Sequence, residues 1–399
     1  SEEGQLEIKM EIERFNTKRS IINLCLFFLI FMLVVTFMSQ LGMGFISTSF
    51  IKTIGKTLTL CLAALALDLV WGYCGILSLG HFAFFAMGGY LIGMWLMYER
   101  TKDIVLQAAL NEALPPTAPE IKETIGSQIF GVVGGSEIPT IWFFADFLSI
   151  QIFLIFLIPG LLALIFGWLA FRSRVTGVYL SILTQAMTLA LSLYLFQNDS
   201  GLRGNNGLSG LQNIPGLETV SQAVISIIFL WLSAIALLGG FLVAFWITRS
   251  KFGVVIMAIR DDESRTRFLG YNVESYKLVI FVITAIVCAI AGSLYYPQAG
   301  IVNPTELAPI ASIYLAVWVA IGGRGNIVGA VLGAAFVSLI SSVFTSGQLP
   351  DIDFFLFKIK WVDWWLPILG VTFVFITLYA PKGIIGILVG EVRIGKSHE

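Results

Sequence analysis

Residues Gly253–Tyr296 read GVVIMAIRDDESRTRFLGYNVESYKLVIFVITAIVCAIAGSLYY. The first half of this stretch carries dense charge of both signs, and the second half is an apolar run that begins at Leu278. A bilayer core of about 30 Å takes roughly 20 apolar residues per helix, so the run predicts a transmembrane span. The fold depends on how often such runs recur along the chain.

The composition of the whole chain is that of a membrane protein. Of its 399 residues, 57% are hydrophobic and only 12% are charged, and the mean hydropathy is +0.88. Soluble domains carry about 25% charged residues. We therefore expect one membrane domain and no soluble domain that folds alone. The net charge of −1 indicates no nucleic-acid partner.

Apolar runs recur from one end of the chain to the other and predict an all-α integral membrane protein with about ten transmembrane helices. The predicted spans are Ile21–Ser39, Thr57–Trp71, Phe82–Tyr98, Ile150–Phe171, Val178–Phe196, Ala223–Thr248, Leu278–Tyr296, Ile310–Ile321, Val328–Phe344 and Trp364–Ala380. Pro159 is expected to kink the fourth. The membrane domain then covers 21–386, between an N-terminal segment (1–20) and a tail (387–399).

An even number of spans places both termini on one side of the membrane. About two thirds of the lysine and arginine residues lie on that side, which predicts that it is the cytoplasm of a bacterial cell with the chain in the plasma (inner) membrane. The charged segment 249–277 is then cytoplasmic. Two long polar loops, 99–140 and 197–221, face outward, either as passive tethers or as a docking face for a partner.

The charged segment predicts a short helix on the cytoplasmic surface. Acidic residues come first and arginines later, which suits the helix dipole; Glu263 and Arg267 form a favourable i,i+4 pair, and Gly270 is a plausible C-cap. Orientation rules would need only basic residues, whereas this segment adds acids and an apolar edge, so we favour a partner-binding surface over a solvated loop. Its candidate contact residues are Arg260, Asp261, Asp262, Glu263, Arg265, Arg267 and Gly270.

Glycines mark two further places. Residues Gly72–His81 (GYCGILSLGH) are apolar but broken by glycines, which predicts either a tight turn or an unwound stretch beside a pathway, covered by protein or water. Gly325, Gly329 and Gly333 repeat the GxxxG spacing that allows close helix packing.

Four polar residues within or beside apolar spans are candidates for the transport pathway: Asp68, His81, Thr184 and Gln185. A carboxylate inside a bilayer costs at least ~2.5 kcal/mol, so Asp68 must face protein or water. For each residue, the alternative is a structural hydrogen bond between helices. Asp68 has the further alternative of capping a backbone group or bonding Tyr73 or Trp71.

The sequence predicts no enzyme and no metal or cofactor site. The four cysteines and two histidines form no ligand pattern, and no HExxH or GxSxG motif is present. GEVRIGKS (Gly390–Ser397) matches the phosphate-loop pattern by letter. We reject it because that loop needs a following helix and nucleotide domain, and only two residues follow it in this sequence.

Several motifs resemble those of ABC importer permeases of the branched-chain amino acid class. They are the opening stretch, LSLGHFAFFAMGGY (Leu77–Tyr90), AIGGRGNIVGAVLGAAF (Ala320–Phe336) and APKGIIG near the C-terminus. Within that class, ALDLVWGYCGILSLGH, VYLSILTQAMTLAL and FQNDSGLRGNNGLSG are most similar to the larger permease subunit of urea transporters.

The resemblance implies a permease that pairs with a second, related permease, is driven by two cytoplasmic ABC ATPase subunits and receives solute from an extracytoplasmic binding protein. The charged segment would then be the contact with the ATPase. Few basic residues lie in the predicted spans, which favours a neutral solute such as urea or a short amide over a zwitterionic branched-chain amino acid. A passive urea or amide channel is a further alternative.

Overall fold

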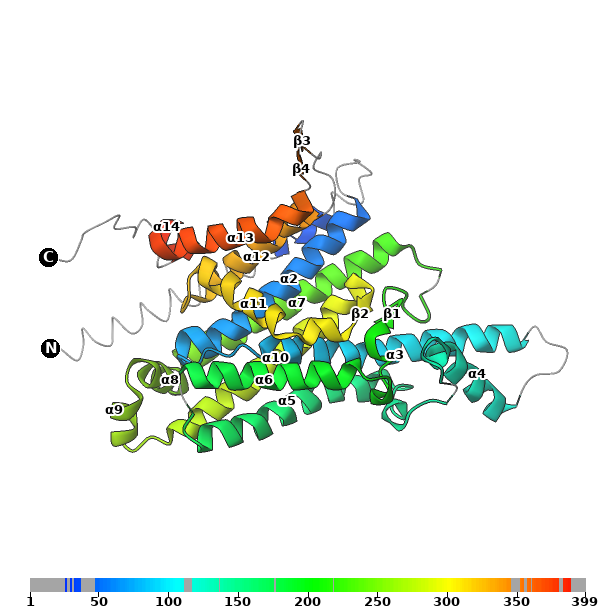
Figure 1. The fold of residues 1–399 in the computed structure, drawn as a ribbon, viewed down its shortest axis with the longest axis horizontal. Coiled ribbons are helices and arrows are strands. Elements are labelled where there is room, and N and C mark those ends of the chain that lie inside the picture. Colours follow the sequence, from blue (N-terminus) through cyan, green and yellow to red (C-terminus); the bar gives the residue numbers. More distant parts are fainter. Residues whose placement is uncertain are drawn as a thin grey trace.

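A computed structural model defines the fold of the chain. It describes residues 47–345 except 111–116, 136, 176 and 218, together with 26, 29–30, 32–36, 352–354, 357–359, 361–379 and 383–388. Nearly all described elements are helices (Figure 1). The predicted class, an all-α membrane protein, is confirmed.

Seven helices in this part of the chain are long and apolar enough to cross a bilayer. They are α2 (Thr48–Asp68, continued by the π-helical turn η1, Leu69–Tyr73), α3 (His81–Leu110), α5 (Leu148–Arg172), α6 (Val178–Phe196), α7 (Gln222–Arg249), α10 (Val273–Ala299) and α12 (Ile327–Thr345). Two further apolar helices are α11 (Pro309–Gly322) and α13 (Trp361–Tyr379).

Short elements connect these helices. They are α4 (Ala118–Phe130), η2 (Gly131–Val133), η3 (Thr140–Trp142), η4 (Asn198–Ser200), η5 (Gly204–Asn206), α8 (Lys251–Asp261), α9 (Glu263–Phe268), η6 (Pro304–Leu307) and α14 (Gly383–Leu388). Two antiparallel strand pairs complete the set: β1 (Leu208–Ser209) with β2 (Ile301–Val302), and β3 (Ile352–Phe354) with β4 (Phe357–Ile359).

Nine of the ten predicted spans correspond to these helices. The fifth span matches α6 end to end, and the bounds of most others differ by a few residues. Two differ more: α2 begins nine residues before the predicted Thr57, and α3 continues twelve residues past the predicted Tyr98. Most of the first predicted span, Ile21–Ser39, lies outside the described residues, and the part that is described is helical.

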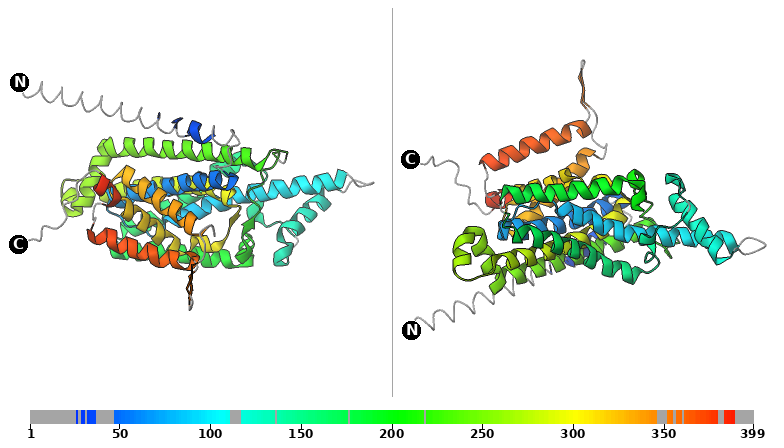
Figure 2. Two further views of the ribbon diagram at one scale, coloured as in Figure 1. Left: turned by 90° about the horizontal axis from the view of Figure 1, so that it is seen from above. Right: turned by 60° about the horizontal axis from the view of Figure 1, so that its bottom comes forward.

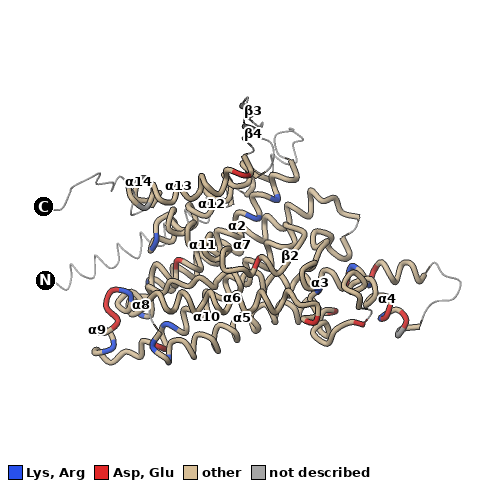
Figure 3. The backbone as a smooth tube through the Cα atoms, in the orientation of Figure 1, with Lys and Arg blue, Asp and Glu red and all other residues tan. Residues whose placement is uncertain are grey.

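The long helices run side by side, most of the short helices lie at the two ends of the bundle, and the β3–β4 pair projects from one side (Figures 1 and 2). At one end lie α8, α9 and α14, and we call it the α9 end. At the opposite end, α3 and α4 project beyond the other helices, and we call it the α4 end. Figure 3 shows a dense group of charged residues of both signs at the α9 end.

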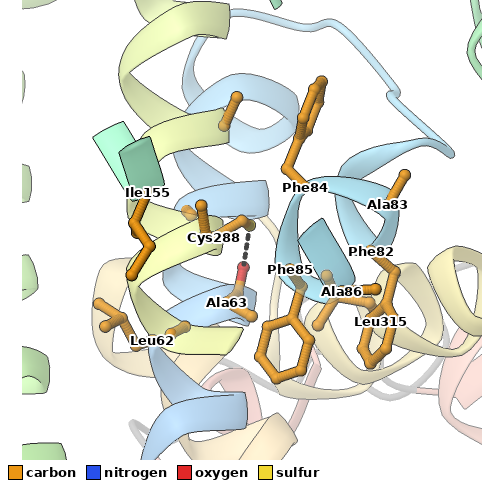
Figure 4. Close-up of a cluster of buried hydrophobic side chains, with 14 of the residues drawn as sticks. Leu62, Ala63, Phe82, Ala83, Phe84, Phe85, Ala86, Ile155, Cys288 and Leu315 are labelled. Carbon is orange, nitrogen blue, oxygen red and sulfur yellow. Dashed lines mark hydrogen bonds between the residues drawn. The ribbon is translucent and has the colours of Figure 1, made fainter. Parts of the chain in front are cut away.

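The core forms around α2 and η1, because 83% of the most apolar stretch of Thr48–Tyr73 is buried. Small side chains such as Ala63 and Ala289 line its contacts and are completely covered. Figure 4 shows this region, where the Cys288 thiol lies 3.9 Å from the carbonyl oxygen of Ala63. The three described cysteines are free and buried, and Cys25 lies outside the described residues.

Glycines allow two helix pairs to approach closely. A Cβ on Gly88 of α3 would collide with the carbonyl of Ala289 on α10, and one on Gly292 would collide with the carbonyl of Phe85. Between α11 and α12, a Cβ on Gly333 would collide with the Trp318 carbonyl. The packing role predicted from the GxxxG spacing is therefore confirmed for α12.

The polar segments at the α4 end are folded. The sequence predicts a loop over 99–140, but α3 continues into it and α4 follows, because Thr117 and Glu120 form a capping box that starts this second helix. The second loop packs against the end of the first: a Cβ on Gly201 would lie 3.0 Å from the side chain of Pro139, and the indole of Trp142, just after the first loop, donates a 2.7 Å hydrogen bond to the Gly201 carbonyl.

Candidate functional site

The break between α2 and α3 is the first part of the candidate site. After η1 the chain is not helical until His81, and its irregular backbone is held by hydroxyl groups of two other helices, α6 and α11. Thr184 Oγ1 of α6 accepts a 3.0 Å hydrogen bond from the backbone of Leu79, and Ser181 donates to the carbonyl of Leu77 at 2.7 Å. Ser312 of α11 accepts from Phe82 N at 3.1 Å. The predicted unwound stretch is thus present and satisfied by protein groups.

His81 closes this break. Its side chain is fully buried between the rings of Phe84 and Phe281, both in edge-on contact with it. Nδ1 lies 2.8 Å from the Ser78 hydroxyl, and Nε2 lies 3.0 Å from the hydroxyl of Thr284 on α10. Both ring nitrogens are therefore engaged, which supports the structural alternative for this residue.

The two candidates on α6 differ. Thr184 is buried and uses its hydroxyl both to accept from Leu79 and to donate to the carbonyl of Ser181 at 2.8 Å. Gln185 is half-buried, and within the described part of the chain its side chain makes no hydrogen bond. Gln185 therefore keeps its amide available, whereas Thr184 holds the break in place.

Asp68, at the last residue of α2, is the buried carboxylate of the site. It is 1% exposed, and Oδ1 accepts a 2.7 Å hydrogen bond from the backbone of Gly325, in the turn between α11 and α12. This is the capping alternative, with Gly325 as the partner. Oδ2 is buried and has no hydrogen-bond partner among the described residues. A Cβ on Gly72 would collide with Oδ1, so the Asp68 carboxylate can lie here only because residue 72 is glycine.

Arg260 joins the surface segment to this buried site. Its guanidinium donates a 2.9 Å hydrogen bond to the carbonyl of Gly72 in η1 and forms a 3.0 Å ion pair with Asp261. Its stem lies against Gly75, which adopts a φ of +80°. Nearby, the guanidinium of Arg324 lies 5.3 Å from the ring centroid of Trp71. The α8 helix, the π-helical end of α2 and the glycine turn after α11 therefore meet at one point.

The charged segment forms two helices where the sequence predicts one. Asp262 has extended backbone, ends α8 and caps α9 by accepting a 2.9 Å hydrogen bond from Arg265 N. Because of this break, Arg260 lies on α8 and Ser264 lies on α9. Gly270 has a φ of +92° and follows the end of α9, which confirms its role in terminating the helix.

The inner charges of this segment bind one another. Glu263 pairs with Arg267 at 3.0 Å, the predicted i,i+4 pair, and with the buried Lys277 at 2.6 Å. Arg267 also pairs with Glu274 at 3.0 Å. These charges fix α9 against the start of α10.

The outer edge of the segment is left uncovered. The exposed fractions are 93% for Phe268, 73% for Leu269 and 43% for Tyr271. Arg265 also projects, with 82% of its side chain exposed. A mixed-charge helix with an apolar rim on one end of a membrane bundle is a surface suited to a protein partner.

The sequence identifies the candidate pathway residues but not the groups that form hydrogen bonds with them. Gly325 and Ser312 belong to the site only because distant helices bring them to the break. The glycine cluster after α11 was a usable signal, but its spacing indicates packing and not a backbone donor for Asp68. The tail with the phosphate-loop letters lies outside the described residues, and those described contain no cluster of three possible metal ligands.

The fold and site together define a multi-pass membrane permease: a helical bundle with a broken central segment and a projecting surface segment tied to it. Comparison with known proteins agrees. A family model described as "Branched-chain amino acid transport system / permease component" matches residues 49–377. The chain belongs to this family of ABC importer permeases.

Among curated relatives, the autoinducer 2 import system permease proteins LsrC of Shigella flexneri and Escherichia coli (strain K12 / DH10B) are each 34% identical over 145 residues. The protein of the same name from Salmonella paratyphi B is 30% identical over 145 residues. Each match covers 34% of this chain and 42% of the relative, so it spans less than half the length of these proteins. No solved structure gives a significant match.

Proposed function

We propose that this chain is a permease subunit of an ATP-driven importer that moves urea or short amides across the bacterial inner membrane. The observation that carries the proposal is the joint at Arg260. It links the exposed α8–α9 surface, where an ATPase subunit would bind, to the broken end of α2, where a transport pathway would open. Both chain termini would then lie in the cytoplasm with the α9 end.

The partners follow from the same assignment. Two ABC ATPase subunits would drive the importer, with an ATPase contacting the α8–α9 surface at the apolar rim of Phe268 and Leu269, and a second, homologous permease would complete the membrane part. An extracytoplasmic solute-binding protein would dock on the α4 end. The folded, mutually packed segments there support a docking face better than a passive tether.

The choice of solute rests on the polar groups around the break. They are hydroxyls, one imidazole, one amide and one carboxylate. The nearby arginines are already engaged, Arg260 with the Gly72 carbonyl and Asp261, and Arg324 with the Trp71 ring. Urea offers N–H donors and one carbonyl, which the unpartnered oxygen of Asp68 and the free amide of Gln185 could bind. A zwitterionic amino acid would need a site for each charge.

Two other importer solutes have specific support. The family description favours a branched-chain amino acid, and the names of the LsrC relatives favour autoinducer 2. A passive urea channel is a third possibility, but a channel needs no surface tied to its broken helix.

Uptake measurements test the proposal. The complex that copurifies with the tagged chain is reconstituted in proteoliposomes with labelled urea outside and ATP at the ATPase. We expect uphill urea uptake only with ATP and the binding protein, with competition by acetamide and not by leucine or autoinducer 2. Competition by leucine or autoinducer 2 alone would assign that solute instead, and downhill uptake without ATP would support the channel.

A further inference from the structure

We propose that a cavity at the α9 end, between α5 and α10, binds the phosphate headgroup of an anionic glycerophospholipid. The cavity has a volume of about 350 Å³. It is lined by Trp168, Phe171, Arg172, Arg174, Asn272, Glu274, Ser275 and Leu278. It lies where the last turn of one transmembrane helix meets the first turn of another, which is the depth of lipid headgroups.

The charge of the cavity favours an anion. Arg172 and Arg174 both line it, and the side chain of Arg174 is 73% exposed. The single acid, Glu274, is already paired with Arg267 at 3.0 Å and lies 4.0 Å from Arg174. Two arginines therefore face one carboxylate that a third arginine neutralises. Basic pockets between transmembrane helices on the cytoplasmic side are suited to anionic headgroups.

The helix ends at the cavity add to its positive electrostatic potential. The 27-residue helix α10 begins at the cavity with Asn272 as its N-cap, so the positive end of its dipole points toward the site. Arg174 has a φ of +53°, a left-handed conformation that follows the end of α5 and brings its side chain to the same cavity. The cavity is thus built by the two helix ends and does not depend on arginine side chains alone.

The surface beside the cavity fits an acyl chain. An exposed apolar stripe runs down α5 at helical spacing, through Phe153, Leu157, Leu161, Leu164 and Trp168, each between 44% and 61% exposed. The next position on this face is Arg172, whose guanidinium lies 5.0 Å from the Trp168 ring centroid. The stripe covers fifteen residue steps, roughly 22 Å at 1.5 Å per residue, which exceeds one half of a ~30 Å bilayer core. This continuity from apolar stripe to basic cavity favours a whole lipid over a free anion.

Lipid retention tests the assignment. The protein is purified from nanodiscs of phosphatidylcholine with and without phosphatidylglycerol, and the bound lipid is counted by native mass spectrometry. We expect the wild type to retain phosphatidylglycerol selectively. Each arginine removed, as Arg172→Gln or Arg174→Gln, should weaken retention about fivefold, since a basic residue near the surface contributes on the order of 1 kcal/mol.

The matched control is Arg249→Gln, at the end of α7. This arginine also ends a transmembrane helix and also lies over an aromatic ring, 5.9 Å from the centroid of Phe245, but it does not line the cavity. Its variant should retain the lipid like the wild type. Thermal unfolding of each variant in the same detergent shows that it is folded, and the exposed Arg174 is the safer single change.

Three results would overturn the proposal. The first is equal retention of phosphatidylglycerol by the wild type and the arginine variants. The second is displacement of the lipid by soluble glycerol phosphate alone, which would indicate a free-anion site. The third is loss of association with the second permease while lipid retention stays unchanged, which would show that this face is a protein interface.

Discussion

At the scale of single residues, Asp68 combines a structural bond with an unused oxygen. Asp68→Asn keeps an acceptor for Gly325 N and removes a charge that is costly in the membrane, so we expect an unfolding temperature equal to or above that of the wild type, with reduced urea uptake. Asp68→Leu removes the acceptor and should cost about 1–3 kcal/mol of stability. Thermal unfolding in detergent and uptake assays check both. A stable, fully active Asp68→Leu would show that the carboxylate has neither role.

Thr184 gives a sharper test of the break between α2 and α3. Thr184→Val keeps the shape of the side chain but leaves the backbone N–H of Leu79 without its acceptor, which should destabilise the protein by about 1–3 kcal/mol. Thr184→Ser keeps the hydroxyl and serves as the control. If the Val and Ser variants unfolded at the same temperature, the break would not depend on this bond.

The sequence identified Asp68, His81 and Thr184 because polar groups in apolar spans are expensive and must have partners. It could not identify those partners. Gly325 follows Asp68 by 257 residues and Thr284 follows His81 by 203, so only the folded bundle brings them together. Local pattern predicts which groups need satisfying, whereas tertiary packing determines what satisfies them.

At the scale of elements, α3 and α10 approach each other closely in the core. Gly88→Ala would force the two helices apart because its Cβ meets the Ala289 carbonyl, and we expect a lower unfolding temperature and reduced membrane yield. Gly239→Ala in α7 is the matched control, since nothing lies within 4 Å of its Cβ. It should be neutral or slightly stabilising, because Ala favours helix over Gly. The account of the core fails if both variants behave alike.

Arg260 connects α8 to η1, and its substitution should uncouple ATP hydrolysis from urea uptake. Arg260→Met keeps the aliphatic stem against Gly75 and removes the hydrogen bond to Gly72 in η1. We expect the assembled complex to hydrolyse ATP while urea uptake per ATP falls several-fold. Lys251→Met, an exposed position at the start of α8, is the control and should leave that ratio unchanged. An unaltered ratio in Arg260→Met would argue against transmission through this joint.

Helix positions were more predictable than connections. The apolar run of α6 is bounded sharply on both sides, so its ends could be read from the sequence. The polar residues after Tyr98 look like a loop, yet α3 continues to Leu110 because it packs against α4 beyond the apolar span. The two-helix form of the charged segment depends on the extended backbone of Asp262, which no periodicity indicates.

At the scale of the whole molecule, the sequence predicted the class of fold, the order of spans and a projecting charged segment. It did not predict how the segment is held. Glu263 and Arg267 are occupied with each other and with the start of α10, so the surface left for a partner is the apolar rim together with the exposed Asp261 and Asp262, and not this inner pair. That distinction needs side-chain geometry and determines which substitution is informative.

The most direct test of the account is the copurification of ATP-hydrolysing subunits with the tagged chain. Phe268→Asp places a charge in the centre of the apolar rim and should weaken ATPase binding by about 2 kcal/mol or more, as at an aromatic hot spot. Phe143→Asp, at another highly exposed phenylalanine on the α4 end, should leave ATPase binding intact; Phe268 is 93% exposed and Phe143 is 78% exposed. We predict ATPase subunits with the wild type and Phe143→Asp and their loss from Phe268→Asp. Full retention of the ATPase subunits by Phe268→Asp would contradict the claim that they bind this surface.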